Sequence, residues 1–209
     1  MMTPPTFEQA LYNESLRQAY LDSLLPHCPE SVLGLIYKTD KLELFSRLSP
    51  ARQKEISEML NQLGGKLSDY LPPLLMSVPK PISSQFGLFL RSPIFVEARS
   101  FHLLSEARFT NALFDHEIVH CSDFYQGITL SNGTVLNHKN IASLQDITLD
   151  AILEYRAYRV ESERWKEKSM IDPEWTGYLD EELKIYRDIL KCIDPQTDLE
   201  RIAREEYLS

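Results

Sequence analysis

Several features that define common protein classes are scarce or missing in this sequence. Cysteine occurs three times in 209 residues, an odd and widely spaced set (Cys28, Cys121, Cys192) that does not suit a disulfide framework. No apolar run approaches the ~20 residues of a membrane-spanning helix. The N-terminus lacks a basic segment followed by an apolar stretch, so we expect no cleaved signal peptide. The expected location is the cytoplasm, or a host cell after export that uses no cleaved signal.

Positive charge is also in short supply. The chain has 22 Lys and Arg against 31 Asp and Glu, a formal net charge of −9, and its basic residues are scattered. Binding to nucleic acid needs clustered Lys and Arg to contact phosphates, so we expect no nucleic-acid partner. Hydrophobic residues make up 43% and charged residues 25%, a composition typical of a globular protein of one ordinary domain.

The first 80 residues carry mainly helical patterns. Apolar residues recur at helical spacing over Phe7–Leu25, and Ser31–Leu48 is expected to form one or two short helices. Ser49 and Pro50 are typical of a helix start, and that helix should end before Gly64. The Pro-rich segment Asp69–Pro81 is expected to be a connection. We therefore treat residues 1–80 as a helical N-terminal region.

Residues 81–209 mix strands with helices. Short strands are expected over 82–104, with the one that contains Pro93 at a sheet edge, because proline cannot donate a ladder hydrogen bond. Asn132 and Gly133 between apolar flanks predict a hairpin over 128–137. Helices are expected over 105–125, 146–168, 180–193 and 198–207. This order favours a predominantly helical α+β fold, in which the two regions could still form one compact domain.

One motif in the second region carries chemistry. Residues 116–120 are His-Glu-Ile-Val-His, the HExxH signature, within a predicted helix. Residues four apart lie one turn apart on the same face, so His116 and His120 can bind one metal ion together. Glu117 lies about 100° around the helix, where it can reach a metal-bound water without becoming a ligand. The pattern predicts a Zn²⁺ site, since zinc takes nitrogen and oxygen ligands and leaves a position for water.

A zinc site of this kind needs a third protein ligand, and Glu154 is the favoured candidate. It shares one predicted helical face with Ile147, Ala151 and Tyr158, and a carboxylate on an apolar face is costly unless it is paired or bound to a cation. An ion pair between Glu154 and an arginine such as Arg156 or Arg159 is the simpler interpretation of the same pattern. The other possible ligands are Asp150, Asp123 and Glu161.

With HExxH and a glutamate on a later helix, residues 105–165 resemble the gluzincin group of zinc metallopeptidases. The resemblance implies a zincin-like active-site helix, with His116, His120 and Glu154 as zinc ligands and Glu117 as the base that activates water. The Asp that gluzincins commonly place four residues after the third ligand is Tyr158 here. The partner of His116 is then expected to be Asp150 or Asp123. The sequence motifs that contain Asp123 and Glu154 are also similar to those of a small mitochondrial processing peptidase family.

The resulting hypothesis is a zinc-dependent endopeptidase that acts on a protein or peptide. The candidate donors to the oxyanion are Tyr158, Tyr155, Tyr125 and His138, which the sequence does not rank. Tyr158 is taken as the catalytic candidate because it lies one turn from Glu154 and could reach the metal. The strand Ser92–Arg99 is the expected docking edge for an extended substrate. The small size and lone motif also resemble injected bacterial effector peptidases. The alternatives are a zinc hydrolase of another amide bond, and a non-catalytic helical binding module with an incidental or structural zinc motif.

Overall fold

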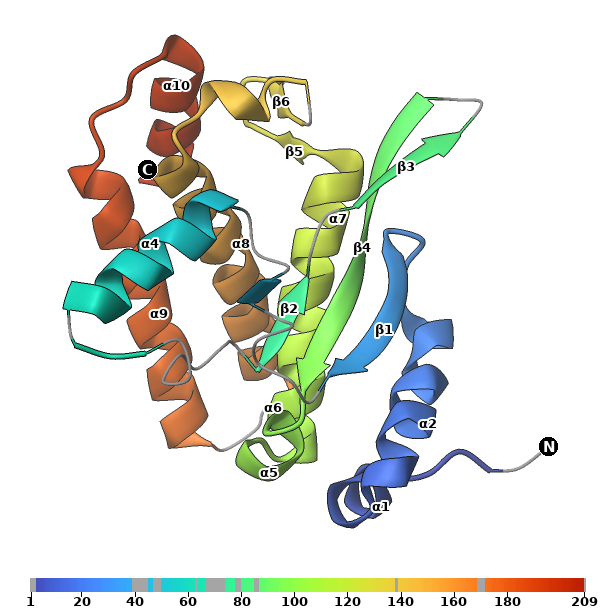
Figure 1. Cartoon of the computed structure of the whole chain (residues 1–209). Helices are drawn as coiled ribbons and strands as arrows, with labels where there is room; N and C mark the ends of the chain where they lie inside the picture. Colours follow the sequence, from blue (N-terminus) through green and yellow to red (C-terminus); the bar gives the residue numbers. More distant parts are fainter. Residues whose placement is uncertain are drawn as a thin grey trace.

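The computed structural model describes residues 3–38, 45–46, 50–62, 64–66, 74–77, 80–84, 87–137, 139–168 and 172–208. It has the predicted class, a mostly helical α+β structure with a small sheet and a two-stranded hairpin. Figure 1 shows the N-terminal helices beside β1 at one side of the sheet and the C-terminal helices at the other, with α7 and β4 between them.

The predicted N-terminal helix is divided into two. α1 (Phe7–Tyr12) and α2 (Glu14–Leu24) are separated by Asn13, and a short 3₁₀ turn, η1 (Leu25–His27), follows. Asn13 has an extended backbone, and its side chain accepts a hydrogen bond from the backbone N–H of Ser15. Asn13 thus ends α1 and caps α2, because a side-chain oxygen at this position replaces a missing helical partner.

The helix expected over Ser31–Leu48 is wrong in its first part. Val32–Lys38 forms strand β1, which pairs in parallel with β4 (Gly87–Glu97). Short apolar runs do not distinguish a strand from a buried helix, and here the pairing with β4 decides the outcome. Residues 39–44 and 47–49 lie outside the described residues. The helix expected after Ser49 is confirmed as α4 (Pro50–Gln62).

Strand β4 is central, which corrects the prediction of an edge strand. β1 lies on one side of β4 and β2 (Leu75–Ser77) on the other, and β3 (Lys80–Ser84) pairs with its first half. Pro93 is tolerated because it lies opposite Gly34 beside a register shift in β1, and the antiparallel pairings of β4 stop at Arg91 and resume at Ile94. A missing ladder donor costs little at such an interruption.

Helices follow directly after β4. Phe101 and Leu103, which were expected in strands, lie in α5 (Ser100–Leu103). The helix expected over 105–125 is continuous but changes its winding: α6 (Glu106–Asn111) leads into a π-helical segment, η3 (Ala112–Glu117), and then α7 (Ile118–Gln126).

The hairpin and the C-terminal helices are confirmed. β5 (Ile128–Thr129) and β6 (Val135–Leu136) pair across the predicted turn, in which Gly133 has φ 83°. Helix α8 (Asp146–Glu167) follows a 3₁₀ turn, η4 (Ile141–Ser143), and α9 begins earlier than expected (Pro173–Cys192). The last helix is α10 (Asp198–Glu206). α8 packs against both α9 and the η3–α7 helix, which places it between them (Figure 1).

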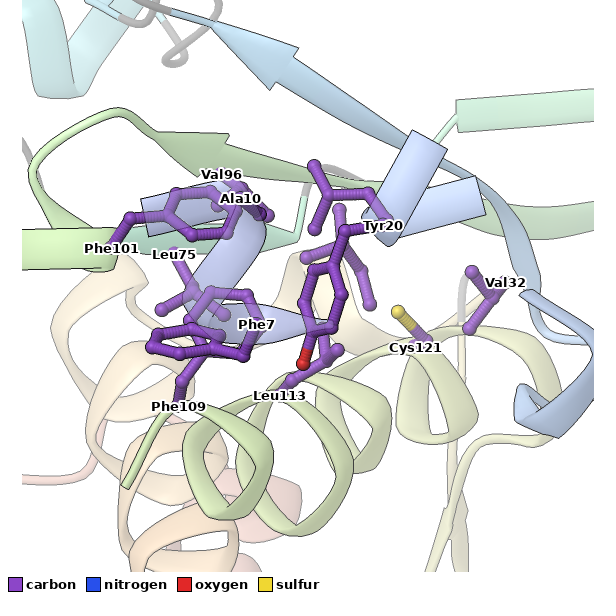
Figure 2. Close-up of a cluster of buried hydrophobic side chains, with 12 residues drawn as sticks. Phe7, Ala10, Tyr20, Val32, Leu75, Val96, Phe101, Phe109, Leu113 and Cys121 are labelled. Atoms are coloured by element: carbon purple, nitrogen blue, oxygen red, sulfur yellow. The ribbon is translucent and has the colours of Figure 1, made fainter. Parts of the chain in front are cut away.

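The main core joins the N-terminal helices to the helix that carries the HExxH motif. Figure 2 shows the rings of Phe7, Phe101 and Phe109 gathered beside Leu113, and their centroids lie 5.4–5.5 Å apart. All four side chains are at most 5% exposed. Because Leu113 belongs to η3, burial of this cluster fixes the back of the motif helix and leaves its other face for α8.

Candidate metal centre

The HExxH motif lies where the helix changes from π to α winding. His116 and Glu117 are the last residues of η3, and His120 lies in the first full turn of α7. π-helical turns are rare and are found frequently at functional sites. Leu113, in the same π-helical segment, is fully buried in the core.

The two histidines and Glu154 converge on one point. The Nε2 atoms of His116 and His120 are 3.1 Å apart, and the Glu154 carboxylate lies 3.4 Å from the first and 3.5 Å from the second. Together they form a group that could hold a metal ion, which confirms the predicted clustering of these three residues. Two segments that lie about thirty residues apart in the chain supply it, because α8 packs against η3 and α7.

These distances fit a tetrahedral ion. Two ligand atoms that each lie about 2.1 Å from such an ion are about 3.4 Å apart. The 3.1 Å between the two Nε2 atoms and the 3.4 Å between Nε2 of His116 and Oε2 of Glu154 are close to this value, and the 3.5 Å contact of His120 is made to the other oxygen, Oε1. The imidazoles are only 8% and 6% exposed. Two buried nitrogens and a carboxylate oxygen at this spacing are a chemically suitable set of donors for a divalent metal.

Glu161 is the partner of His116, in place of the predicted Asp150 or Asp123. Its Oε2 lies 3.0 Å from Nδ1 of His116, and its side chain is only 1% exposed. Nδ1 then carries the proton and Nε2 presents its lone pair to the metal position. Glu161 lies two turns beyond Glu154 on α8, so the same helix supplies a ligand and the group that orients another ligand.

Without a metal, the cluster is held together by charge. Burial disfavours the charged form of His116, but hydrogen bonds to Glu154 and Glu161 outweigh it and hold its pKa well above the ordinary value. Burial likewise opposes ionisation of Glu154, yet the His120 charge and hydrogen bonds from both histidines hold its pKa far below the usual range. The metal-free site therefore keeps a proton on His116 that a metal must displace.

Glu117 lies inside the site and is not part of the ligand group. Its side chain is 6% exposed, Ser77 on β2 hydrogen-bonds one part of the carboxyl, and Oε2 has no partner among the described residues. Burial raises the pKa of Glu117, against the opposing effect of the neighbouring histidines. An unpaired buried carboxyl oxygen is costly, so it indicates a position at which a ligand or water is expected.

Tyr158 lies against the site, as predicted, but its hydroxyl is engaged elsewhere. Its ring packs edge-on against His116 with centroids 4.4 Å apart, and its hydroxyl lies 3.0 Å from that of Tyr178 on α9. Tyr155 packs instead against Tyr207, and Tyr125 lies near the end of α7. His138 lies outside the described residues.

Asp123, another of the acidic candidates, has a structural partner. Asp123 and Arg156 form a two-pronged ion pair with distances of 2.9 and 3.0 Å, which joins α7 to α8 and leaves Glu154 without that arginine. Cys121 is fully buried, and its sulfur contacts the backbone oxygen of Ser92. It therefore points into the core and away from the histidines.

The prediction of an apolar, core-facing stripe on α8 is wrong for one of its residues. Ile147 is 56% exposed and, with Ile185 and Ile189, lines an open groove of about 790 Å³ between α8 and α9. The sequence analysis missed Ser77 and Tyr178, and it gave Glu161 only as an alternative ligand and not as the partner of His116, because each role depends on which elements pack beside the motif. The one available signal was Glu161 itself, an acidic residue seven positions after Glu154 on the same helical face.

Within the described residues, no helix is both long enough and apolar enough to cross a membrane. Comparisons of the chain with protein-family models, curated proteins and solved structures gave no match. The functional argument therefore depends on the geometry of the site.

Proposed function

We propose that this protein is a zinc-dependent metallopeptidase of the gluzincin type, with His116, His120 and Glu154 as the zinc ligands and Glu117 as the general base. The observation that carries the proposal is the convergence of these three ligands beside a buried carboxylate that is not one of them. A structural zinc site is normally closed by a fourth protein ligand, whereas a catalytic site keeps a position open for water. The described residues supply three, which favours the catalytic alternative.

Bound zinc would supply Lewis acidity and lower the pKa of a water molecule in the open position. Glu117 accepts the proton of that water and later passes it to the leaving amine, a role that suits a carboxyl whose pKa burial has raised. Ser77 keeps the carboxyl oriented from β2. Glu161 holds the His116 ring in position through Nδ1.

The docking edge proposed for the substrate moves from Ser92–Arg99 to β2. β4 is flanked by β1 and β2, whereas β2 is the last strand of the described sheet on that side. β2 contacts η3, and its Ser77 reaches the catalytic carboxyl. An extended peptide that adds to this edge would bring its backbone close to Glu117.

The experiment that tests the proposal compares metal content and peptide hydrolysis in the wild type, Glu154→Ala and Glu117→Gln. We expect about one zinc per chain in the wild type. Glu154→Ala should lose the metal, whereas Glu117→Gln should keep it and lose hydrolysis of a proteome-derived peptide library by at least about 10²-fold. A wild type that takes up no zinc after reconstitution, or that cleaves nothing the Glu117→Gln variant leaves intact, would refute the proposal.

A further inference from the structure

One face of α9 lies along the metal centre and carries a carboxylate that the proposed chemistry does not use. Tyr178, Glu182 and Tyr186 are spaced four residues apart on this helix, so they lie one turn apart on the same face. Tyr178 hydrogen-bonds to Tyr158, and the ring of Tyr186 stacks on the ring of Tyr158 with centroids 5.8 Å apart. Glu182 lies between these two contacts and therefore faces the same side as Tyr158, which packs against His116.

Glu182 has no counter-charge of its own. Among the described residues, no lysine or arginine forms an ion pair with it, and the charged groups that act on it are Glu154, Glu181 and His116. Partial burial and then the neighbouring Glu154 raise the pKa of the Glu182 carboxyl, as expected where negative charge is in excess. On α8, Arg156 pairs with Asp123 and Lys166 pairs with Asp180.

The balance of charge stays negative when a metal is bound. Glu117, Glu154, Glu161 and Glu182 all lie at or beside the centre, whereas histidines that bind a metal are neutral. A divalent ion offsets only part of this charge. The buried, unpartnered Oε2 of Glu117 indicates a position at which water or a ligand is expected. Glu154 and His116 act electrostatically on both Glu117 and Glu182, so a positively charged group on a substrate bound at the centre would be attracted to the Glu182 side.

We propose that Glu182 is a specificity-determining residue that selects substrates with a cationic group, a lysine or arginine side chain or a free α-amino group, next to the bond that is cleaved. This inference rests on the proposed metallopeptidase function. It identifies the substrate class by its charge, because a carboxylate without a counter-charge beside a negatively charged centre attracts cations and repels acidic residues.

The test uses zinc-binding hydroxamates, whose affinity can be measured without any turnover. N-acetyl-norleucine hydroxamate is neutral, N-acetyl-lysine hydroxamate carries its cation on the side chain, and norleucine hydroxamate carries it on the α-amine. Dissociation constants for the three probes are measured by calorimetry with zinc-loaded wild type, Glu182→Gln and Glu181→Gln. Glu181 is a matched control because it is the neighbouring carboxylate on α9, is exposed, and lines the groove that contains Ile147 and Ile185.

We expect one cationic probe to bind the wild type about ten-fold tighter than the neutral probe. Which of the two cationic probes does so shows whether the enzyme recognises a cationic side chain or a free α-amino group. The ratio of the two dissociation constants should fall to about 1 in Glu182→Gln and remain about ten in Glu181→Gln. Equal binding of all three probes by the wild type, or a preference that survives in Glu182→Gln, would overturn the inference and leave the peptidase proposal intact. Failure of every probe to bind the zinc-loaded wild type would instead show that no coordination position is open, and both proposals would fall.

Discussion

Glu161 accepts a hydrogen bond from Nδ1 of His116 at 3.0 Å, although the two residues are 45 positions apart in the chain. The carboxylate is almost fully buried, and its other oxygen has no partner among the described residues. A buried carboxylate that hydrogen-bonds one ring nitrogen of an imidazole fixes both the orientation of the ring and its tautomer. Helix α8 therefore supplies both Glu154, a member of the candidate ligand group, and Glu161, which orients the ring of another member.

The first prediction concerns this contact. Glu161→Gln should weaken zinc binding by about 10–100-fold, because an amide orients the ring less firmly and does not increase its basicity. The measurement is zinc affinity by competition with a chelator. Glu163→Gln, an exposed position on the same helix, is the control and should bind zinc like the wild type. Equal affinities for both variants would mean that the contact does not support the ligand.

The second prediction concerns pH. In the metal-free protein the raised pKa of His116 gives stability that is full below about pH 6.5 and is lost as pH rises through its folded pKa. The lowered pKa of Glu154 gives stability that is present above about pH 4.5 and is lost as pH falls towards its folded pKa. The metal-free protein should therefore be most stable between these limits, in urea unfolding series at different pH values.

Zinc must displace the His116 proton, and this gives a separate readout of the same pKa. Binding near pH 7 should release about one proton, whereas an unperturbed imidazole would already be mostly neutral. Calorimetry in buffers of different ionisation enthalpy measures the number. Release of almost no proton at pH 7 would contradict the raised pKa of His116.

The third prediction concerns which of two tyrosines, Tyr158 or Tyr178, donates a hydrogen bond to the oxyanion. Burial raises the pKa of the Tyr158 hydroxyl well above the ordinary value, and burial also raises the pKa of Tyr178 to about 12, so both stay protonated as donors. If Tyr158 stabilises the oxyanion, Tyr158→Phe should lower kcat by about 10²–10³-fold with zinc content unchanged. Tyr178→Phe then has a smaller effect. A larger loss in Tyr178→Phe would assign the donor to α9, where Tyr178 is the more exposed of the pair.

The fourth prediction concerns the ion pair between Asp123 and Arg156. Asp123→Asn should lower the free energy of unfolding by about 2 kcal/mol, because it leaves a partly buried guanidinium without its charged partner. Zinc affinity should remain unchanged, since the pair joins α7 to α8 and does not contact the ligands. Urea unfolding and chelator competition test the two halves. Disruption of the exposed Arg159–Glu163 pair should cost less than about 0.5 kcal/mol.

The N-terminal half shows where sequence patterns are insufficient. Val32–Lys38 has the apolar content of a helix or a strand, and only its parallel pairing with β4 makes it a strand. Pro93 favours an edge position on local grounds, yet β4 is central because the ladders on both sides are interrupted at that residue. Both errors concern strand pairing, which depends on residues far apart in the chain.

The sequence by itself determined the part of the site that is local. His116 and His120 share a face because a helix places residues four apart one turn apart, and Glu117 follows beside them. Glu154 is marked by its position on an otherwise apolar face. Only the tertiary structure decided that Glu161 holds His116, that Ser77 orients Glu117 and that α9 brings Glu182 alongside. Those contacts follow from which elements pack against the motif helix, and packing depends on the summed burial of many distant side chains, which no short pattern contains.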